Sequence, residues 1–352
     1  MARDQTVRNG RAAPVIWSLA AAALFGASTP ASKVLLDGMG PLALAGLLYL
    51  GAAVAVLPSA LRSGLPGRGR LRPNLRKLAG AVLFGGILGP VLLLVGLSRA
   101  PAASIALWLN LETVATAILG WLFFREHLGR WTWIAVVLTV AAGVALASPS
   151  GFEFAPAAGL VGLACICWGL DNNLTSLIDG FTPAQTTLVK GLCAGVVNLG
   201  LALFLESSDF SVGTVFGALT VGGFGYGLSI VLYIRGAQHL GATRSQILFS
   251  TAPFLGGLFA WTFLREQVMP SQLIAIAVML PALWILLRTK HEHEHAHVSR
   301  NHTHSHCHDD GHHKHMYEGH STARRHTHEH THEPDVHSHA HDPDLHHRHA
   351  HS

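Results

Sequence analysis

The stretches WLNLETVATAILGWLFFREHL (108–128) and FSTAPFLGGLFAWTFLREQV (249–268) are two copies of one pattern, about 140 positions apart. Aligned without gaps, Trp121 falls on Trp261, and the same Arg-Glu pair follows each tryptophan at the same distance. Both copies are too apolar for a soluble domain. Duplicated membrane halves are typical of transporters whose substrate site lies between two repeats.

The composition predicts an all-α membrane protein. Half of the 352 residues are apolar and only 12% are charged. A membrane-spanning helix needs roughly 20 mainly apolar residues. Ten such runs are present, near 14–35, 41–60, 78–98, 101–124, 131–148, 157–177, 183–205, 213–235, 242–264 and 270–289.

Three parts follow from this division. Residues 1–148 and 157–289 each hold five spans, so the second half must enter the membrane in the opposite sense. This predicts two inverted five-helix repeats, the arrangement that lets one fold alternate between two faces. The third part, 290–352, lacks the apolar residues that a packed core needs and is expected to be a disordered cytoplasmic tail.

Basic residues predict the orientation. Arginine and lysine gather in segments that lie on one side if the N-terminus is cytoplasmic, above all in 62–77. The positive-inside rule therefore places both termini in the cytoplasm of a multi-pass plasma (inner) membrane protein. The high pI reflects these loops beside anionic lipid and does not indicate a nucleic-acid partner.

The repeats resemble the EamA repeat of the drug/metabolite transporter superfamily. The resemblance rests on the two Phe-x-Arg-Glu helix ends and on the entry to the ninth span, GAQHLGATRS (236–245), and covers roughly 14–289. It implies a ten-helix permease with a central cavity, without naming a substrate. The second copy has the helix-breaking Ala252-Pro253 where the first has Glu112-Thr113, so we expect a straighter helix in the first copy.

Glu112 is the first candidate site residue. It lies near the middle of its span, where an ionised carboxylate costs about 3 kcal/mol or more unless it meets protein, water or a cation. Helical spacing places Trp108, Glu112 and Thr116 on one face, with Asn110 on an adjoining face. Glu112 either couples transport or contacts substrate, or else it holds helices together as a polar bridge.

A second candidate group lies on the hairpin of the sixth and seventh spans. Asp171 and Lys190 are at similar depth, and an ion pair is expected because each charge alone would be expensive to bury. Trp168 and Asn172 share the face of Asp171. The pair is either structural or lines the cavity. Lys33, near the end of the first span, is expected to extend toward the interface and receives no role.

Glycines give an independent indication. Gly85, Gly86 and Gly89 in the third span correspond to the run GGFGYG (222–227) in the eighth. Interrupted helices are expected beside a transporter's site, although close helix packing explains such glycines equally well. Tyr226, between these glycines, is a candidate gate or stacking residue.

The tail is rich in histidine. Of the 25 histidines, 23 lie after residue 290, mostly as His-x-His. Neutral imidazole suits zinc, nickel and cobalt, so the tail is a candidate site for divalent transition-metal ions. A neutral low-complexity extension is the alternative. The candidate ligands are His291, His293, His295, His297, His302, His304, His306, His308, His326, His328, His330 and His332.

The sequence therefore predicts a secondary-active permease in the lipid bilayer that exports a metabolite, an amino-acid-like compound or a drug by alternating access. Export rests on the resemblance alone. We expect no enzymatic activity and no required cofactor, with zinc, nickel or cobalt as ions that the tail could hold. One alternative is export of a transition metal or a metal chelate. A second is a membrane-anchored metal sensor or buffer.

Overall fold

The computed structural model describes most of the membrane part and four short segments of the tail. It divides the chain into two compact units, 1–289 and 290–352. The first copy's Arg125-Glu126 pair and His308 of the tail lie outside the described residues. The described residues are 2–64, 68–124, 129–147, 155–178, 180–206, 210–240, 248–288, 291–297, 300–306, 326–332 and 335–341.

The first unit is all-α over its described residues. Its first half consists of α1 (Ala2–Leu35), α2 (Pro41–Arg62), α3 (Arg68–Gly80), η1 (Ala81–Leu88), α4 (Gly89–Leu97), α5 (Ala102–Trp108), α6 (Leu111–Phe124) and α7 (Arg130–Ala147). Its second half consists of α8 (Ala155–Ser176), α9 (Pro183–Leu205), α10 (Val212–Val221), η2 (Gly222–Leu228), α11 (Ser229–Leu240), α13 (Ala252–Phe263) and α14 (Pro270–Arg288).

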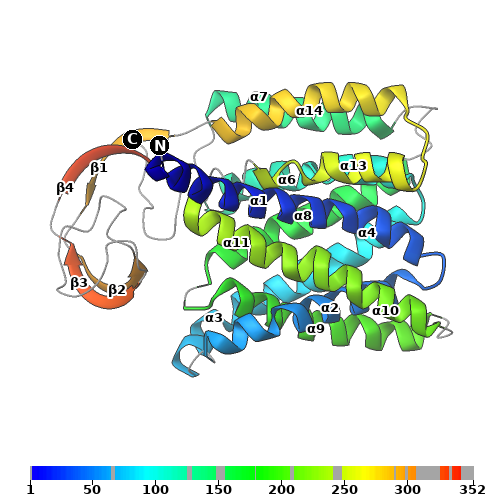
Figure 1. Cartoon of the computed structure of the whole chain (residues 1–352), viewed down its shortest axis with the longest axis horizontal. Helices are drawn as coiled ribbons and strands as arrows, with labels where there is room; N and C mark the ends of the chain where they lie inside the picture. The colour runs from blue at the N-terminus through cyan, green and yellow to red at the C-terminus, as the bar shows by residue number, and fades with distance from the viewer. Residues whose placement is uncertain are drawn as a thin grey trace. The chain divides into compact units, whose positions relative to one another are not determined.

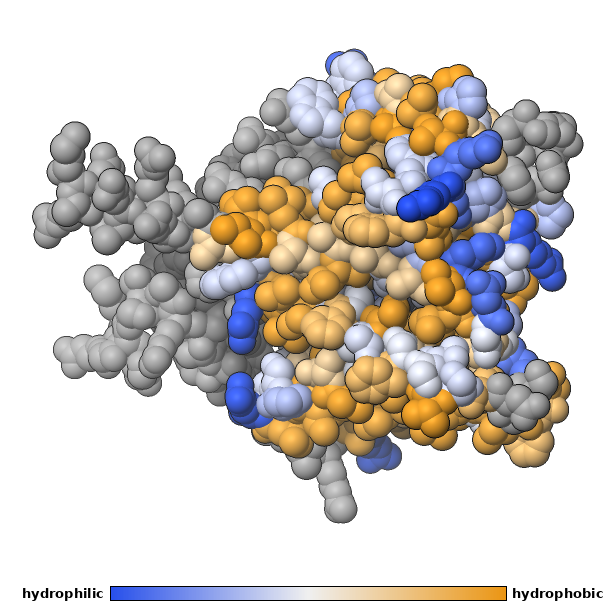
Figure 2. Space-filling model, turned by 45° about the vertical axis from the view of Figure 1, so that its right-hand side comes forward, coloured by the Kyte–Doolittle hydropathy of each residue, from blue (hydrophilic) through white to orange (hydrophobic). Residues whose placement is uncertain are grey.

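Seven of the ten predicted spans are confirmed as long apolar helices, and the other three correspond to shorter apolar helices. Seven helical segments are long and apolar enough to cross a membrane, and three shorter apolar helices, 130–146, 252–263 and 270–285, complete the set of ten. Large apolar side chains face outward, such as Phe204 at 87% and Phe216 at 71% exposure. The face shown in Figure 2 is accordingly dominated by hydrophobic residues. In a bilayer this surface contacts lipid tails.

Helix packing follows the inverted repeat. In the first half, α4 and α6 both pack on α8, which begins the second half. In the second half, their counterparts α11 and α13 both pack on α1. Figure 1 shows α7 and α14 side by side at one edge of the bundle, with α2 and α9 at the opposite edge. Each half therefore packs against the first helix of the other.

Two π-helices interrupt the third and eighth spans, as the glycine pattern predicts. η1 (Ala81–Leu88) and η2 (Gly222–Leu228) are about 140 positions apart, the same distance as the sequence copies. Close helix packing, the other explanation for these glycines, is also observed. A Cβ added to Gly222 would lie 2.1 Å from Leu48 O, and one added to Gly227 would lie 2.6 Å from Ala55 Cβ. Such π-turns are frequent at functional sites.

The expectation of a straighter fourth span is wrong. The span breaks between α5 and α6, at Leu109-Asn110, although it has no proline there. The Asn110 side chain donates to Leu107 O at 2.9 Å, and Glu112 N donates to Leu109 O at 3.0 Å. These local bonds replace the α-helical ladder, a known effect of asparagine side chains. Both halves therefore carry a broken helix, with Glu112 in the first turn of α6 and Pro253 in the first turn of α13.

The second unit was expected to lack regular structure, but it contains four short strands. These are β1 (His291–His297), β2 (Arg300–His306), β3 (His326–His332) and β4 (Asp335–His341). β1 pairs with β4 and β2 pairs with β3, both antiparallel. The His-x-His alternation has the two-residue period of a strand, which is a physical reason for extended pairing.

Candidate functional site

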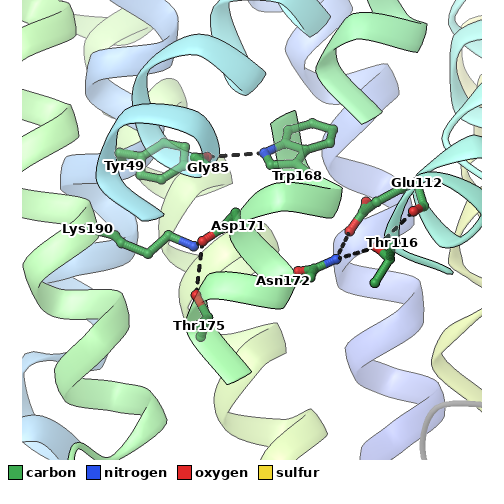
Figure 3. Close-up of polar contacts among 9 residues, drawn as sticks. All are labelled: Tyr49, Gly85, Glu112, Thr116, Trp168, Asp171, Asn172, Thr175 and Lys190. Atoms are coloured by element: carbon green, nitrogen blue, oxygen red, sulfur yellow. Dashed lines mark hydrogen bonds and ion pairs between the residues drawn. The ribbon is translucent and has the colours of Figure 1, made fainter. Parts of the chain in front are cut away.

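Glu112 lies beside the break in the fourth span, where α6 begins. Its Oε1 accepts a hydrogen bond from Asn172 Nδ2 at 2.9 Å, and the same amide reaches Thr116 Oγ1 at 3.2 Å (Figure 3). Glu112 is half-buried and Asn172 is exposed. Among the described residues, no cation lies within ion-pair distance of Glu112. The carboxyl group is thus held by an amide and remains available to a proton or a ligand.

Asp171 and Lys190 form the ion pair that the sequence predicts. Asp171 Oδ2 accepts from Lys190 Nζ, and Oδ1 accepts from Thr175 Oγ1 at 3.0 Å (Figure 3). The side chains are 7% and 18% exposed, so the charges are largely removed from solvent. Asn172, which binds Glu112, is the residue next to Asp171 on α8. We call Glu112, Asp171 and Lys190, which come from α6, α8 and α9, the charged wall.

The π-helix η1 is fixed by side chains from three other helices. Gly85 O accepts from Tyr49 Oη and, at 3.1 Å, from Trp168 Nε1 (Figure 3). Gly86 O accepts from Asn198 Nδ2 at 3.1 Å. A π-turn shifts the backbone bonds from i+4 to i+5 and leaves carbonyls without their usual donors. Buried side-chain donors satisfy these carbonyls, as buried polar groups require.

Aromatic rings form a second wall on the α1 and η2 side. Tyr226 lies 5.7 Å from Phe25 and 6.0 Å from Tyr49 between ring centroids, and Phe249 lies 5.5 Å from Phe25. Tyr49 also shares the acceptor Gly85 O with Trp168 of α8, the helix that carries Asp171. Tyr49 therefore lies between the aromatic rings and the charged wall.

Two of the predicted site residues lie elsewhere. Trp108 is fully buried, and its Nε1 donates to Gly143 O of α7 at 2.9 Å. Asn110 is buried in the helix break and bonds its own turn. The expected common face of Trp108 and Glu112 required a continuous helix, and the break at 109–110 removes that continuity.

Lys33 reaches the end of α4, at the same end of the bundle as the end of its own helix. Its Nζ donates to Leu97 O and, at 3.1 Å, to Ala100 O. Leu97 is the last residue of α4, and a cation is favourable at the C-terminal end of a helix. Lys33 therefore holds one connection of the bundle in place.

Sequence reasoning missed Tyr49 and Phe25. Tyr49 is the one polar side chain between Pro41 and Pro58, so its isolation in an apolar run was an available signal. Phe25 gave no such signal, because a phenylalanine in an apolar span is expected either to face lipid or to pack in the core. Only the packing of α1 against η2 places it beside Tyr226.

No metal centre is found in the part of the chain whose side chains are described. Those residues, all in the membrane unit, contain no group of three or more His, Cys, Asp or Glu positioned to hold a metal ion. Of the tail candidates, His302, His304 and His306 pair in register with His330, His328 and His326 in the β2–β3 sheet. In the β1–β4 sheet, His291, His293 and His295 pair with His341, His339 and His337, three residues outside the predicted set.

Comparison with known proteins gives consistent similarities. The EamA-like transporter family matches the chain twice, over residues 12–148 and 156–288. An uncharacterized transporter from Methanothermobacter thermautotrophicus is 26% identical over 288 residues, covering 76% of this chain and 84% of that protein. A solved crystal structure superposes with a TM-score of 0.56 at 16% identity, covering 78% of this chain and 96% of that chain. At that identity it supports the fold alone.

Proposed function

The chain belongs to the EamA-like transporter family, and from this premise we propose that it is a secondary-active permease that exports a small organic molecule by alternating access. Both halves contribute to the interior region between the charged wall and the aromatic rings. Such a position between inverted repeats is where substrate sites lie in this kind of transporter.

The observation that carries the proposal is the unpaired carboxyl group of Glu112. Asp171 and Lys190 neutralise one another, so within the part of the chain that the structure describes Glu112 has an amide partner and no cation in ion-pair contact. That group favours a proton or a positively charged ligand. The rings of Tyr226, Tyr49 and Phe25 favour a cation with an apolar part, because aromatic faces attract ammonium groups.

We therefore propose that the substrate is a metabolite, amino-acid-like compound or drug with a protonated amino group beside an apolar or ring portion. Glu112 would bind this amino group in exchange for a proton. A bare transition metal fits less well, since the described side chains of the membrane unit offer no cluster of metal ligands.

Three probes of similar skeleton test the charge requirement. Phenethylamine, phenylalanine and phenylpropionate share a ring and differ in charge. Exchange of one ammonium ion for one proton moves no net charge, so radiolabelled uptake is measured instead of current. Proteoliposomes with the full chain should take up the amine and the zwitterion. Phenylpropionate, which lacks an amino group, should not be taken up above the level of protein-free liposomes. Uptake of phenylpropionate as large as that of the other two would refute the proposed substrate class.

The tail supports a second, separate proposal. Its His-x-His composition favours several weak sites for zinc, nickel or cobalt, which would serve regulation or buffering and not the transport path. Calorimetric titration of the full chain with nickel and zinc, against a variant with the tail histidines changed to serine, tests this. Equal heats from the two proteins would leave the tail without this role.

A further inference from the structure

One end of the bundle joins the two halves through carboxylates. This end carries residues 36–40, 98–101 and 264–269 and is predicted to be external; we call it the outer end. Glu266, just after α13, accepts from the consecutive amides of Ala102 and Ala103 at 2.7 and 2.9 Å. These amides begin α5, so a carboxylate of the second half caps a helix of the first.

Glu206 makes the same contact elsewhere at the outer end. At the end of α9, its two oxygens accept from the consecutive amides of Leu42 and Ala43 at 2.9 and 3.0 Å. Both glutamates reach across the halves, and in both cases the amides follow a proline at the helix start. The two contacts are therefore chemically matched.

The helices that they join differ. Glu206 connects α9 and α2, each of which runs unbroken through its span. Glu266 connects α13 and α5, which are the outer parts of the two broken spans. A break lets the outer part of a span move while the inner part stays, so the α5–α13 contact lies where movement is expected.

Other contacts converge on the start of α5. Lys33 Nζ binds Leu97 O and Ala100 O just before it, and Gln272 Nε2 donates to Ser104 Oγ at 3.0 Å. Arg265, next to Glu266, has φ = 54°, and it is the one non-glycine residue with positive φ among those the structure describes. Such strained backbone is found at clamps and switch regions.

We propose that Glu266 is a positioning residue of the transport cycle: its contact with α5 holds the outer parts of the two broken spans together and is released when the outer end opens. This inference rests on the proposed permease function. It adds a residue that controls which face is open, without touching the substrate.

A matched pair of variants tests the proposal without any substrate. Glu266→Gln places a side-chain NH₂ group, which is a donor, opposite one of the two backbone N–H donors at the start of α5. Glu206→Gln makes the same change at the contact between the unbroken helices α9 and α2. The background replaces the four cysteines by serine and carries one reporter, Ser104→Cys. Ser104 is 1% exposed beneath the Gln272 contact. A membrane-impermeant maleimide applied to intact cells measures its exposure from outside.

Glu266→Gln should raise the outside labelling rate about tenfold or more, the effect of weakening a charge-assisted bond. Glu206→Gln should change it by less than about twofold, because Glu206 joins two helices that run unbroken through their spans, without a break that could act as a hinge. A second reporter, Thr175→Cys, lies on the inner side of Asp171. Its labelling in inside-out vesicles should fall in Glu266→Gln, because opening one face closes the other.

Three outcomes would overturn the proposal: no change in Glu266→Gln, an equal increase in both glutamine variants, or increased labelling of both reporters. If Glu266→Gln does not fold, Ala102→Pro removes one of the two donors instead. Proline is accepted at a helix start, and Pro101 has the extended ψ of 140° that a following proline requires. Absence of solute flux in the probe assay would instead refute the permease function, so the two failures are distinguishable.

Discussion

At the scale of single residues, the Asp171–Lys190 pair carries the clearest energetic prediction. Asp171→Asn or Lys190→Met alone leaves a buried, unpaired charge, which costs up to about 3–5 kcal/mol. The double variant should recover part of that loss, because neither charge remains. Thermal unfolding of the four proteins in detergent measures the coupling. Simple addition of the two single effects would show that the residues act independently.

Spacing along the chain was sufficient to predict this pair. Asp171 and Lys190 lie at similar distances from the hairpin turn, so their depth followed from helix rise alone. The partners of Glu112 could not be obtained in this way. Asn172 belongs to a helix of the other half, and only the packing of α6 on α8 brings the two together.

At the scale of elements, the two π-helices depend on glycine. A Cβ at Gly85 would lie 2.0 Å from Asp171 Oδ2, so Gly85→Ala must displace the carboxylate from Lys190. We expect loss of transport and a lower unfolding temperature. Gly162→Ala on α8 is the control, because nothing lies within 4 Å of its added Cβ. It should stabilise by about 0.5–1 kcal/mol. Equal behaviour of the two variants would contradict this account of η1.

The interrupted helices were only partly predictable. Glycines at corresponding positions predicted that the third and eighth spans are interrupted, but not that the interruptions are π-helices. The break at Leu109-Asn110 has no proline to indicate it in the sequence; it is accompanied instead by a bond from the Asn110 side chain to Leu107 O. Replacing Asn110 by leucine removes the competing amide and should extend α6 toward α5.

At the scale of the whole molecule, the topology is directly testable. Reporter fusions after Arg72 and after the C-terminus should read cytoplasmic, and a fusion after Ser207 should read external. This follows from the basic segments and from the even number of spans. An external C-terminus would contradict the orientation, and with it the assignment of the outer end.

The tail is expected to be dispensable for folding of the permease. The membrane unit, 1–289, is compact by itself, so deletion of residues 291–352 should leave it inserted and its thermal unfolding unchanged. Metal-dependent regulation or metal tolerance should change. A deletion variant that fails to reach the membrane would show that the units depend on each other.

The central claim is that Glu112 couples solute movement to a proton between two inverted halves. The most direct measurement is amine flux into proteoliposomes under an imposed pH gradient, for the parent protein and for Glu112→Gln, which keeps size and polarity. We predict that the parent accumulates the amine and responds when the gradient is reversed. The variant should lose this response while it retains the parent's amount in the membrane. Gradient-driven accumulation in Glu112→Gln at the parent rate would contradict the account.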